Sequence, residues 1–147
     1  MGEVIRGNRA NQTLFSNVQM QTDPPRPIVV ILLLSMINER QPFPLRCAIL
    51  YCFGCYLYRN EEAKATTVAT LLPSEQATSA ITTGQILCTG LFSQNEVFSN
   101  WFCAVALLHT INGNTELKEQ LLRVQLAVNP TAGQQVRAIS SNWNINH

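Results

Sequence analysis

Cysteine is the residue type in this sequence whose spacing could support chemistry. Cys52 and Cys55 are separated by two residues, the gap found in structural zinc sites and in thiol-redox sites. A structural zinc site needs four ligands, usually from a second close pair, and the chain adds only scattered Cys47, Cys88 and Cys103 and two histidines. We therefore expect no metal and no cofactor, and interpret the pair as small side chains on a buried helix. Burial there would raise the pKa of a thiol.

The sequence shows no catalytic constellation. His109 lies near the end of an apolar segment, without Cys, Asp or Glu at catalytic spacing, so we interpret it as a core or dipole-facing histidine. A glycine-rich phosphate loop, a nucleophile elbow and a pattern of paired carboxylates are all missing from the sequence. We expect no catalytic residues and no enzyme. A thiol enzyme that uses Cys52 and Cys55 stays open as the alternative from a different class.

Composition sets the broad class. The 147 residues suffice for one domain with a real core, and charged residues make up 13% with a formal net charge of +1. This balance gives no basic field for phosphate backbones, so no nucleic-acid partner is expected. The longest apolar run, residues 28–34, has less than half of the roughly 20 residues that a membrane-spanning helix needs. An odd number of cysteines in apolar segments is typical of a reducing compartment, which predicts a cytoplasmic protein.

The elements that must position these residues are predicted to be helices, without sheet, because no segment alternates apolar and polar residues. The expected helices cover residues 1–6, 11–19, 28–37, 42–58, 61–72, a short stretch that carries 86–91, then 93–111 and 114–127. Leu14, Phe15 and Val18 are expected on one apolar face of the second helix. Ser93 and Glu96 have the spacing of a capping box at the start of the seventh.

Aromatic side chains in these helices are expected to pack in the core: Trp101, Tyr51, Phe53 and Tyr58. A weak internal repeat supports stacked helices. Cys47-Ala48-Ile49 and Cys103-Ala104-Val105 each lead an apolar helix, which reaches Asn60 or Asn114 and then a second helix. Two helix pairs about one repeat apart suggest a helical solenoid.

Seven strings occur in an order that resembles the head of the general vesicular transport factor family. They are GEVIRG (2–7), PPRP (24–27), SMINERQPF (35–43), LRCAILYCF (45–53), GLFS (90–93), SNW (99–101) and KEQLLRVQLA (118–127). The resemblance implies an all-α, armadillo-like helical solenoid, present here in part, from a peripheral Golgi tether that acts in endoplasmic-reticulum-to-Golgi and intra-Golgi vesicle transport. It also implies a non-catalytic scaffold.

The resemblance gives expectations about domains and partners. Residues 1–127 are expected to be an armadillo-like head fragment, and residues 128–147 a disordered or non-family tail. The coiled-coil rod and acidic tail of full family members have no counterpart in the sequence. The implied partners are a Rab-type GTPase, other Golgi tethers, SNARE machinery and a second copy of the chain, and membrane contact is expected only through such partners.

One helix face is the candidate partner-binding site. Glu116, Glu119, Gln120 and Arg123 lie on the side of the last helix opposite Leu117, and Glu119 and Arg123 have the favourable spacing for an ion pair. A solvated face is the other interpretation. A different armadillo adaptor, of the nuclear-import kind, is the alternative within binding proteins; it would need a ladder of Trp and Asn, and the sequence has a single Asn100-Trp101 pair.

Overall fold

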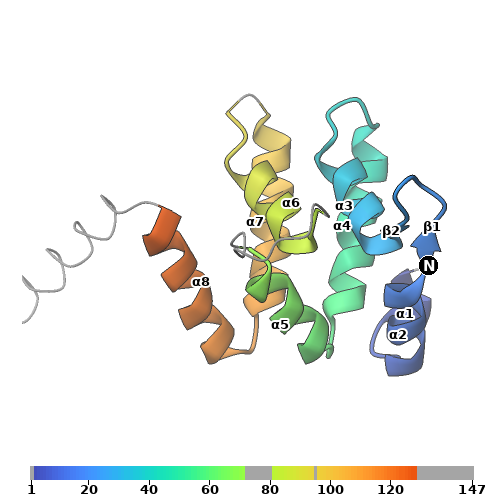
Figure 1. Cartoon of the computed structure of the whole chain (residues 1–147), viewed down its shortest axis with the longest axis horizontal. Coiled ribbons are helices and arrows are strands. Elements are labelled where there is room, and N and C mark those ends of the chain that lie inside the picture. The colour runs from blue at the N-terminus through green and yellow to red at the C-terminus, as the bar shows by residue number, and fades with distance from the viewer. Residues whose placement is uncertain (1, 72–80, 95, 129–147) are drawn as a thin grey trace, which may run out of the picture. The chain divides into compact units, whose positions relative to one another are not determined.

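The computed structural model describes residues 2–71, 81–94 and 96–128, with side chains up to residue 123. Within these ranges the chain forms eight helices and two short strands (Figure 1). In chain order they are α1 (Gly2–Ile5), α2 (Arg9–Asn17), β1 (Gln19–Met20), β2 (Arg26–Pro27), α3 (Ile28–Ile37), α4 (Phe43–Leu57), α5 (Glu61–Ala69), α6 (Thr83–Leu91), α7 (Val97–Ile111) and α8 (Thr115–Val128). The predicted helical class is confirmed.

Within the described residues, the departure from a chain without sheet is a two-residue ladder. β1 pairs antiparallel with β2, with Gln19 opposite Pro27 and Met20 opposite Arg26. The proline-rich segment before α3 cannot be helical, and its extended backbone lies beside the extended exit of α2. The Ile28 amide donates to the Val18 carbonyl at 2.9 Å and continues the contact.

The chain divides into two compact units, residues 1–113 and 114–147. α8 is the described helix of the second unit. The domain boundary expected at Ala127 falls near the end of α8 and stays a prediction. Apart from residue 128, the expected tail of residues 128–147 lies outside the described residues.

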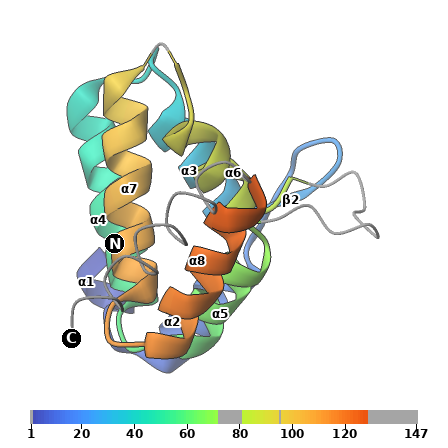
Figure 2. The same cartoon turned by 90° about the vertical axis from the view of Figure 1, so that its left-hand side faces the viewer.

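In the first unit, the helix pair α3 and α4 stands beside the helix pair α6 and α7 (Figure 1). α3 packs against both α4 and α6, and α7 packs against both α6 and α4. Seen from the side, α4 and α7 form one layer and α3 and α6 the other (Figure 2). α4 and α7 run in the same direction, because Phe43 contacts Phe98 near their starts and Gly54 lies beside His109 near their ends.

The core lies between these two layers. Its most completely buried apolar side chains come from α3, α4, α6 and α7: Leu33, Met36, Leu57, Ile86, Leu87, Phe102, Cys103 and Ala106. α2 contributes differently from the prediction, because Phe15 is buried whereas Leu14 and Val18 are exposed. Gln12 takes the second buried position and donates from Nε2 to the carbonyl oxygens of Tyr58 at 2.9 Å and Cys55 at 3.4 Å. The exit of α4 therefore needs a polar partner from α2, which an apolar stripe could not supply.

The capping box expected at Ser93 and Glu96 is wrong. Glu96 is itself the N-cap of α7, and its Oε2 accepts from the Ser99 amide at 2.6 Å. A capping box does occur at the start of α6, between Thr82 and Gln85. The prediction failed because the position of Glu96 is decided by a distant cation, described below, and not by its neighbours in sequence.

Candidate partner-binding surface

A buried ion pair fixes the start of α7 against α4. The Arg46 side chain is 4% exposed, and its Nη2 lies 2.6 Å from Glu96 Oε2. Arg46 also donates from Nε to the Met36 carbonyl at 2.7 Å and from Nη2 to Ser99 Oγ at 3.0 Å. Its guanidinium lies 4.9 Å from the centre of the Phe102 ring. Arg46 thereby joins the end of α3, the start of α4 and the start of α7.

The same contacts hold Glu96 ionised. The hydrogen bond from Arg46 is the main cause that lowers the pKa of the Glu96 carboxyl from 4.5 to about 2, and the hydrogen bonds from Ser99 lower it further. Burial acts in the opposite direction. The carboxylate is thus an N-cap and the counter-charge of Arg46 at once. This arrangement sets the direction in which the first turns of α7 present their side chains.

Five aromatic side chains on the layer of α4 and α7 form what we call the aromatic face: Phe43 and Tyr51 of α4, Tyr58 at the C-cap of α4, and Phe98 and Trp101 of α7. Each is between 41% and 53% exposed. The Phe43 and Phe98 rings meet edge to face with their centres 5.1 Å apart, and Trp101 meets the buried Phe102 at 5.2 Å. Phe98 and Trp101 thus each contact another ring on one side and are exposed to solvent on the other.

These rings correct the sequence interpretation. Phe53 is buried as expected, but Tyr51, Tyr58 and Trp101 are not core residues. On α4 the buried side chains cover more than half of the helix circumference, and Tyr51 and Tyr58 lie on the remaining side. Apolar residues occur on every side of α4, so their spacing in the sequence does not show which side stays exposed.

A pocket of about 360 Å³ lies between α4, α7 and the end of α1, and we call it the α4–α7 pocket. Leu50, Tyr51 and Trp101 are among its walls. Arg6 lies 4.8 Å from the centre of the Tyr58 ring at one side, and Tyr51 donates its hydroxyl hydrogen to Glu3. The pocket combines aromatic walls with charged groups at its edge, which is the usual composition of a site that holds a side chain of a partner.

His109 lies at the edge of the same pocket. It is exposed in the last turn of α7, so the expectation of a core histidine is wrong and the dipole-facing alternative describes its position. Gly54 faces it: a Cβ atom added to Gly54 would lie 3.8 Å from His109 Cδ2, at ordinary contact distance.

All five cysteines are free thiols. Burial raises the pKa of Cys52, of Cys55 and of Cys88, and it raises the pKa of Cys103 to about 12. A catalytic or redox thiol needs the opposite, a pKa lowered toward neutrality. Within the described part of the chain, no three His, Cys, Asp or Glu side chains gather closely enough to hold a metal ion.

The environment of the thiols gives a testable prediction. In the native protein Cys52, Cys55 and Cys103 should react with a disulfide reagent far more slowly than the half-buried Cys47 and Cys88, because burial excludes the reagent and suppresses the thiolate. All five should react quickly in denaturant. Colorimetric titration with mass mapping of the labelled sites checks the order. Fast native labelling of the Cys52 and Cys55 pair would restore the thiol-enzyme alternative.

The sequence-predicted partner site lies on α8. Glu116, Glu119, Gln120 and Arg123 occur on one side of this helix, and Gln120 Nε2 donates to Glu116 Oε1 at 3.4 Å. Among the side chains that the structure describes, Glu119 and Arg123 form no ion pair with each other, so that part of the prediction is wrong. These four residues belong to the second unit, and the aromatic face belongs to the first.

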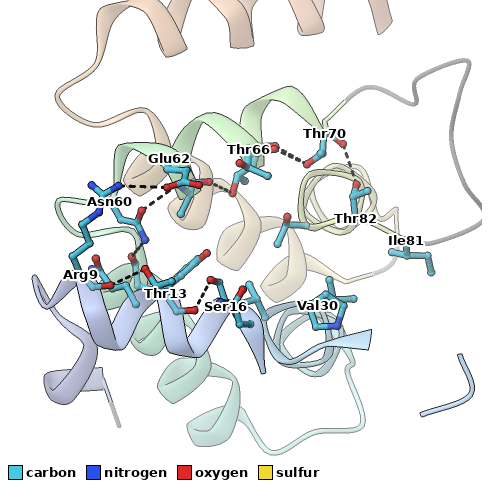
Figure 3. Close-up of a pocket in the computed structure, with 18 residues that line it drawn as sticks. Arg9, Thr13, Ser16, Val30, Asn60, Glu62, Thr66, Thr70, Ile81 and Thr82 are labelled. Carbon is cyan, nitrogen blue, oxygen red and sulfur yellow. Dashed lines mark hydrogen bonds and ion pairs between the residues drawn. The ribbon is translucent and has the colours of Figure 1, made fainter. Parts of the chain in front are cut away.

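A second cavity, of about 510 Å³, lies between α2, α5 and the start of α6 (Figure 3). Most of its lining residues carry a hydroxyl or amide side chain, and Arg9 and Glu62, which also line it, form an ion pair at 3.5 Å. The hydroxyls of Thr13, Ser16 and Thr70 donate to carbonyl oxygens of their own helices. Because these donors are already used within the protein, the cavity has little directed chemistry to offer a ligand.

Comparison with known proteins decides the family. A family described as the head region of Uso1/p115-like vesicle tethering proteins matches residues 8–143 of the chain. The chain belongs to this family. The match continues from residue 128 to residue 143, past the point where the resemblance by sequence strings ends.

The curated relatives agree with this membership. The chain is 56% identical over 129 residues to the General vesicular transport factor p115 of Rattus norvegicus, and 54% identical to that of Homo sapiens. These matches cover 86% of this chain but 13% of each relative, so the chain spans about an eighth of their length. Membership places the chain in the head region of vesicle tethering proteins, and its helices form part of an armadillo-like head. None of the described helices is long and apolar enough to cross a membrane.

Proposed function

We propose that this chain acts as a non-catalytic scaffold of vesicle tethering in endoplasmic-reticulum-to-Golgi and intra-Golgi transport, and that its aromatic face docks a protein partner. The observation that carries the proposal is the set of five half-exposed rings on two adjacent parallel helices. Contiguous exposed apolar surface of this kind marks interaction sites, and aromatic residues supply most of the energetic anchors at protein interfaces.

The geometry supports a rigid interface. The Arg46–Glu96 ion pair and the contact of Trp101 with Phe102 hold the rings before any partner arrives. A ring that is already ordered loses little conformational freedom on binding, so more of the buried area contributes to affinity. Membrane association would then be peripheral and cytoplasmic, through a partner such as a Rab-type GTPase, another Golgi tether, SNARE machinery or a second copy of the chain.

The α8 residues Glu116, Glu119, Gln120 and Arg123 stay a second proposed contact, on their position along one side of that helix. They offer charge and hydrogen bonds, whereas the aromatic face offers apolar anchors. Charged groups at the rim of an interface change association rate and salt dependence more than affinity. Replacing Glu119 and Arg123 with Ala is therefore expected to change binding less than removing two rings.

The proposal is tested by recruitment of the labelled chain to Golgi membranes in cytosol-depleted cells. We expect saturable binding that is lost when the membranes are first treated with protease, because the attachment is to protein. Binding of equal strength to protease-treated membranes, or to protein-free vesicles of the same lipids, would contradict the proposal.

A further inference from the structure

The α4–α7 pocket has a specific chemistry beyond that of a general docking face. Leu50, Tyr51 and Trp101 give it apolar walls, and Gly54 leaves its wall on the α4 side without a side chain. An apolar or aromatic side chain of a partner would find contact on several sides there. The volume of about 360 Å³ lies within the range of pockets that hold a small group.

Arg6 lines this pocket, and the guanidinium groups of Arg6 and Arg59 both lie against the ring of Tyr58, another lining residue. The Arg6 guanidinium lies 4.8 Å and the Arg59 guanidinium 5.3 Å from the centre of the Tyr58 ring. Stacking of this kind holds the plane of a guanidinium while leaving its N–H edge available for a bidentate carboxylate. Among the described residues, neither guanidinium has an ion-pair partner, whereas Arg9 and Arg46 each have one.

The backbone at Arg59 contributes to this arrangement. Arg59 has φ +55°, and it is the one residue other than glycine with positive φ in the described part of the chain. A long side chain adopts this left-handed conformation at a cost, and such residues gather at functional sites. Here the conformation ends α4 and coincides with the placement of the Arg59 guanidinium against Tyr58.

The charges around the pocket favour an acidic occupant. Arg6 and Arg59 are opposed on this side by Glu3, whose carboxylate accepts the Tyr51 hydroxyl hydrogen. Lys64 and Glu61 do not change this balance of charge. Lys64 Nζ lies 2.8 Å from Glu61 Oε1, so their opposite charges offset each other. The two arginines outnumber the one glutamate, so the local charge beside the pocket is positive.

We propose that the α4–α7 pocket binds a partner segment in which an apolar or aromatic side chain is flanked by acidic residues. The apolar group enters between Tyr51 and Trp101, and a flanking carboxylate receives hydrogen bonds from Arg6 and Arg59. This inference rests on the proposed function in that it assigns the chemistry of the docked partner.

The test uses the full chain with Trp143→Phe, so that Trp101 is the only tryptophan and its fluorescence reports on the pocket. Three short peptides serve as probes: phenylalanine between aspartates, phenylalanine between lysines, and alanine between aspartates. We expect the first to bind about tenfold or more tightly than either of the others, a difference of about 1.4 kcal/mol.

Arg6→Gln with Arg59→Gln should reduce binding of the acidic phenylalanine peptide to the level of the lysine peptide. Arg26→Gln with Arg40→Gln is the matched control, because it removes the same charge elsewhere and should leave binding within about twofold. Circular dichroism confirms that all variants fold. Equal binding of acidic and basic peptides, no saturable binding, or an unaffected Arg6 and Arg59 variant would overturn the proposal.

The peptide result is separable from the proposed function. If membrane recruitment needs Phe98 and Trp101 but ignores Arg6 and Arg59, the acidic-partner inference fails and the docking face stands. If the acidic peptide binds but loss of the rings leaves recruitment unchanged, the pocket is real and the proposed docking face is wrong.

Discussion

Arg46→Met should lower the free energy of unfolding by about 3–5 kcal/mol, the usual cost of leaving one partner of a buried ion pair alone. The methionine fills much of the space of the arginine stem but cannot donate to Glu96, to the Met36 carbonyl or to Ser99. Glu96 would stay partly buried, 15% exposed, without its counter-charge. Urea unfolding followed by far-ultraviolet circular dichroism measures the loss.

Arg9→Met is the matched control. Arg9 also pairs with a glutamate, Glu62, but both side chains are more than 80% exposed. Exposed pairs contribute little, so we expect its effect to stay within about 0.5 kcal/mol. An Arg46 variant as stable as the Arg9 variant would show that the buried pair does not organise this part of the fold.

The same ion pair predicts an acid dependence. The pKa of the Glu96 carboxyl is lowered to about 2 in the folded protein and returns to near 4.5 when the chain unfolds. The unfolded chain therefore takes up the proton first as pH falls. The stabilisation by ionised Glu96 is fully present above about pH 4.5 and is lost progressively toward pH 2. Glu96→Gln should remove this component of the acid dependence, visible when urea unfolding is repeated across that pH window.

Gly84→Ala should destabilise the first unit by about 3 kcal/mol or more, at the upper end of overpacking effects. A Cβ atom at Gly84 would lie 2.4 Å from the Leu71 amide nitrogen and 2.6 Å from the Thr67 carbonyl oxygen. Both neighbours are backbone atoms of α5 and its exit, so no side chain can rotate away. The start of α6 would have to move from α5 and break the bond from the Gly84 amide to Thr70 Oγ1.

Gly54→Ala provides the contrast within the same fold. Gly54 lies inside α4, and an added Cβ meets only His109 at ordinary contact distance. Alanine is better than glycine in a helix interior by about 1 kcal/mol, so this variant should be more stable than the parent chain. Thermal unfolding of the two variants side by side checks both signs. A neutral Gly84→Ala variant would mean that α5 and α6 do not approach as closely as the structure has them.

Helices could be predicted where local sequence decides. The bounds expected for α3, residues 28–37, coincide with the helix in the structure, because a proline-rich segment precedes it and Asn38 ends it. α4 begins one residue later and ends one residue earlier than predicted, with Pro42 at its N-cap and Pro44 in its first turn, where missing amides cost least. Asn60 caps α5, at the start that the sequence indicated.

Contacts distant in sequence explain what was missed. Glu96 caps α7 in place of Ser93 because Arg46, which lies 50 residues away along the chain, binds its carboxylate. Gln12 occupies a buried position because the end of α4 presents carbonyl oxygens that need a donor. The sequence around Glu96 does not indicate Arg46, and the sequence around Gln12 does not indicate the end of α4.

The candidate site was missed for a different reason. Trp101 and Phe102 are neighbours of the same apolar type, yet Phe102 is fully buried and Trp101 is half exposed. Composition gives both the same expectation, and only their angular positions on α7 separate them. An aromatic surface for partners therefore resembles a core in sequence, until the packing of α4 against α7 shows which side is covered.

The most direct test of the account is Golgi-membrane recruitment of two double variants. Phe98→Ser with Trp101→Ser removes two rings of the aromatic face, and Val4→Ser with Leu14→Ser removes two apolar side chains that are 65% and 66% exposed elsewhere on the first unit. We predict that the first variant binds about tenfold or more weakly than the parent chain, whereas the second binds within about twofold. Equal recruitment of both variants, with both folded by circular dichroism, would contradict the claim that the aromatic face docks the partner.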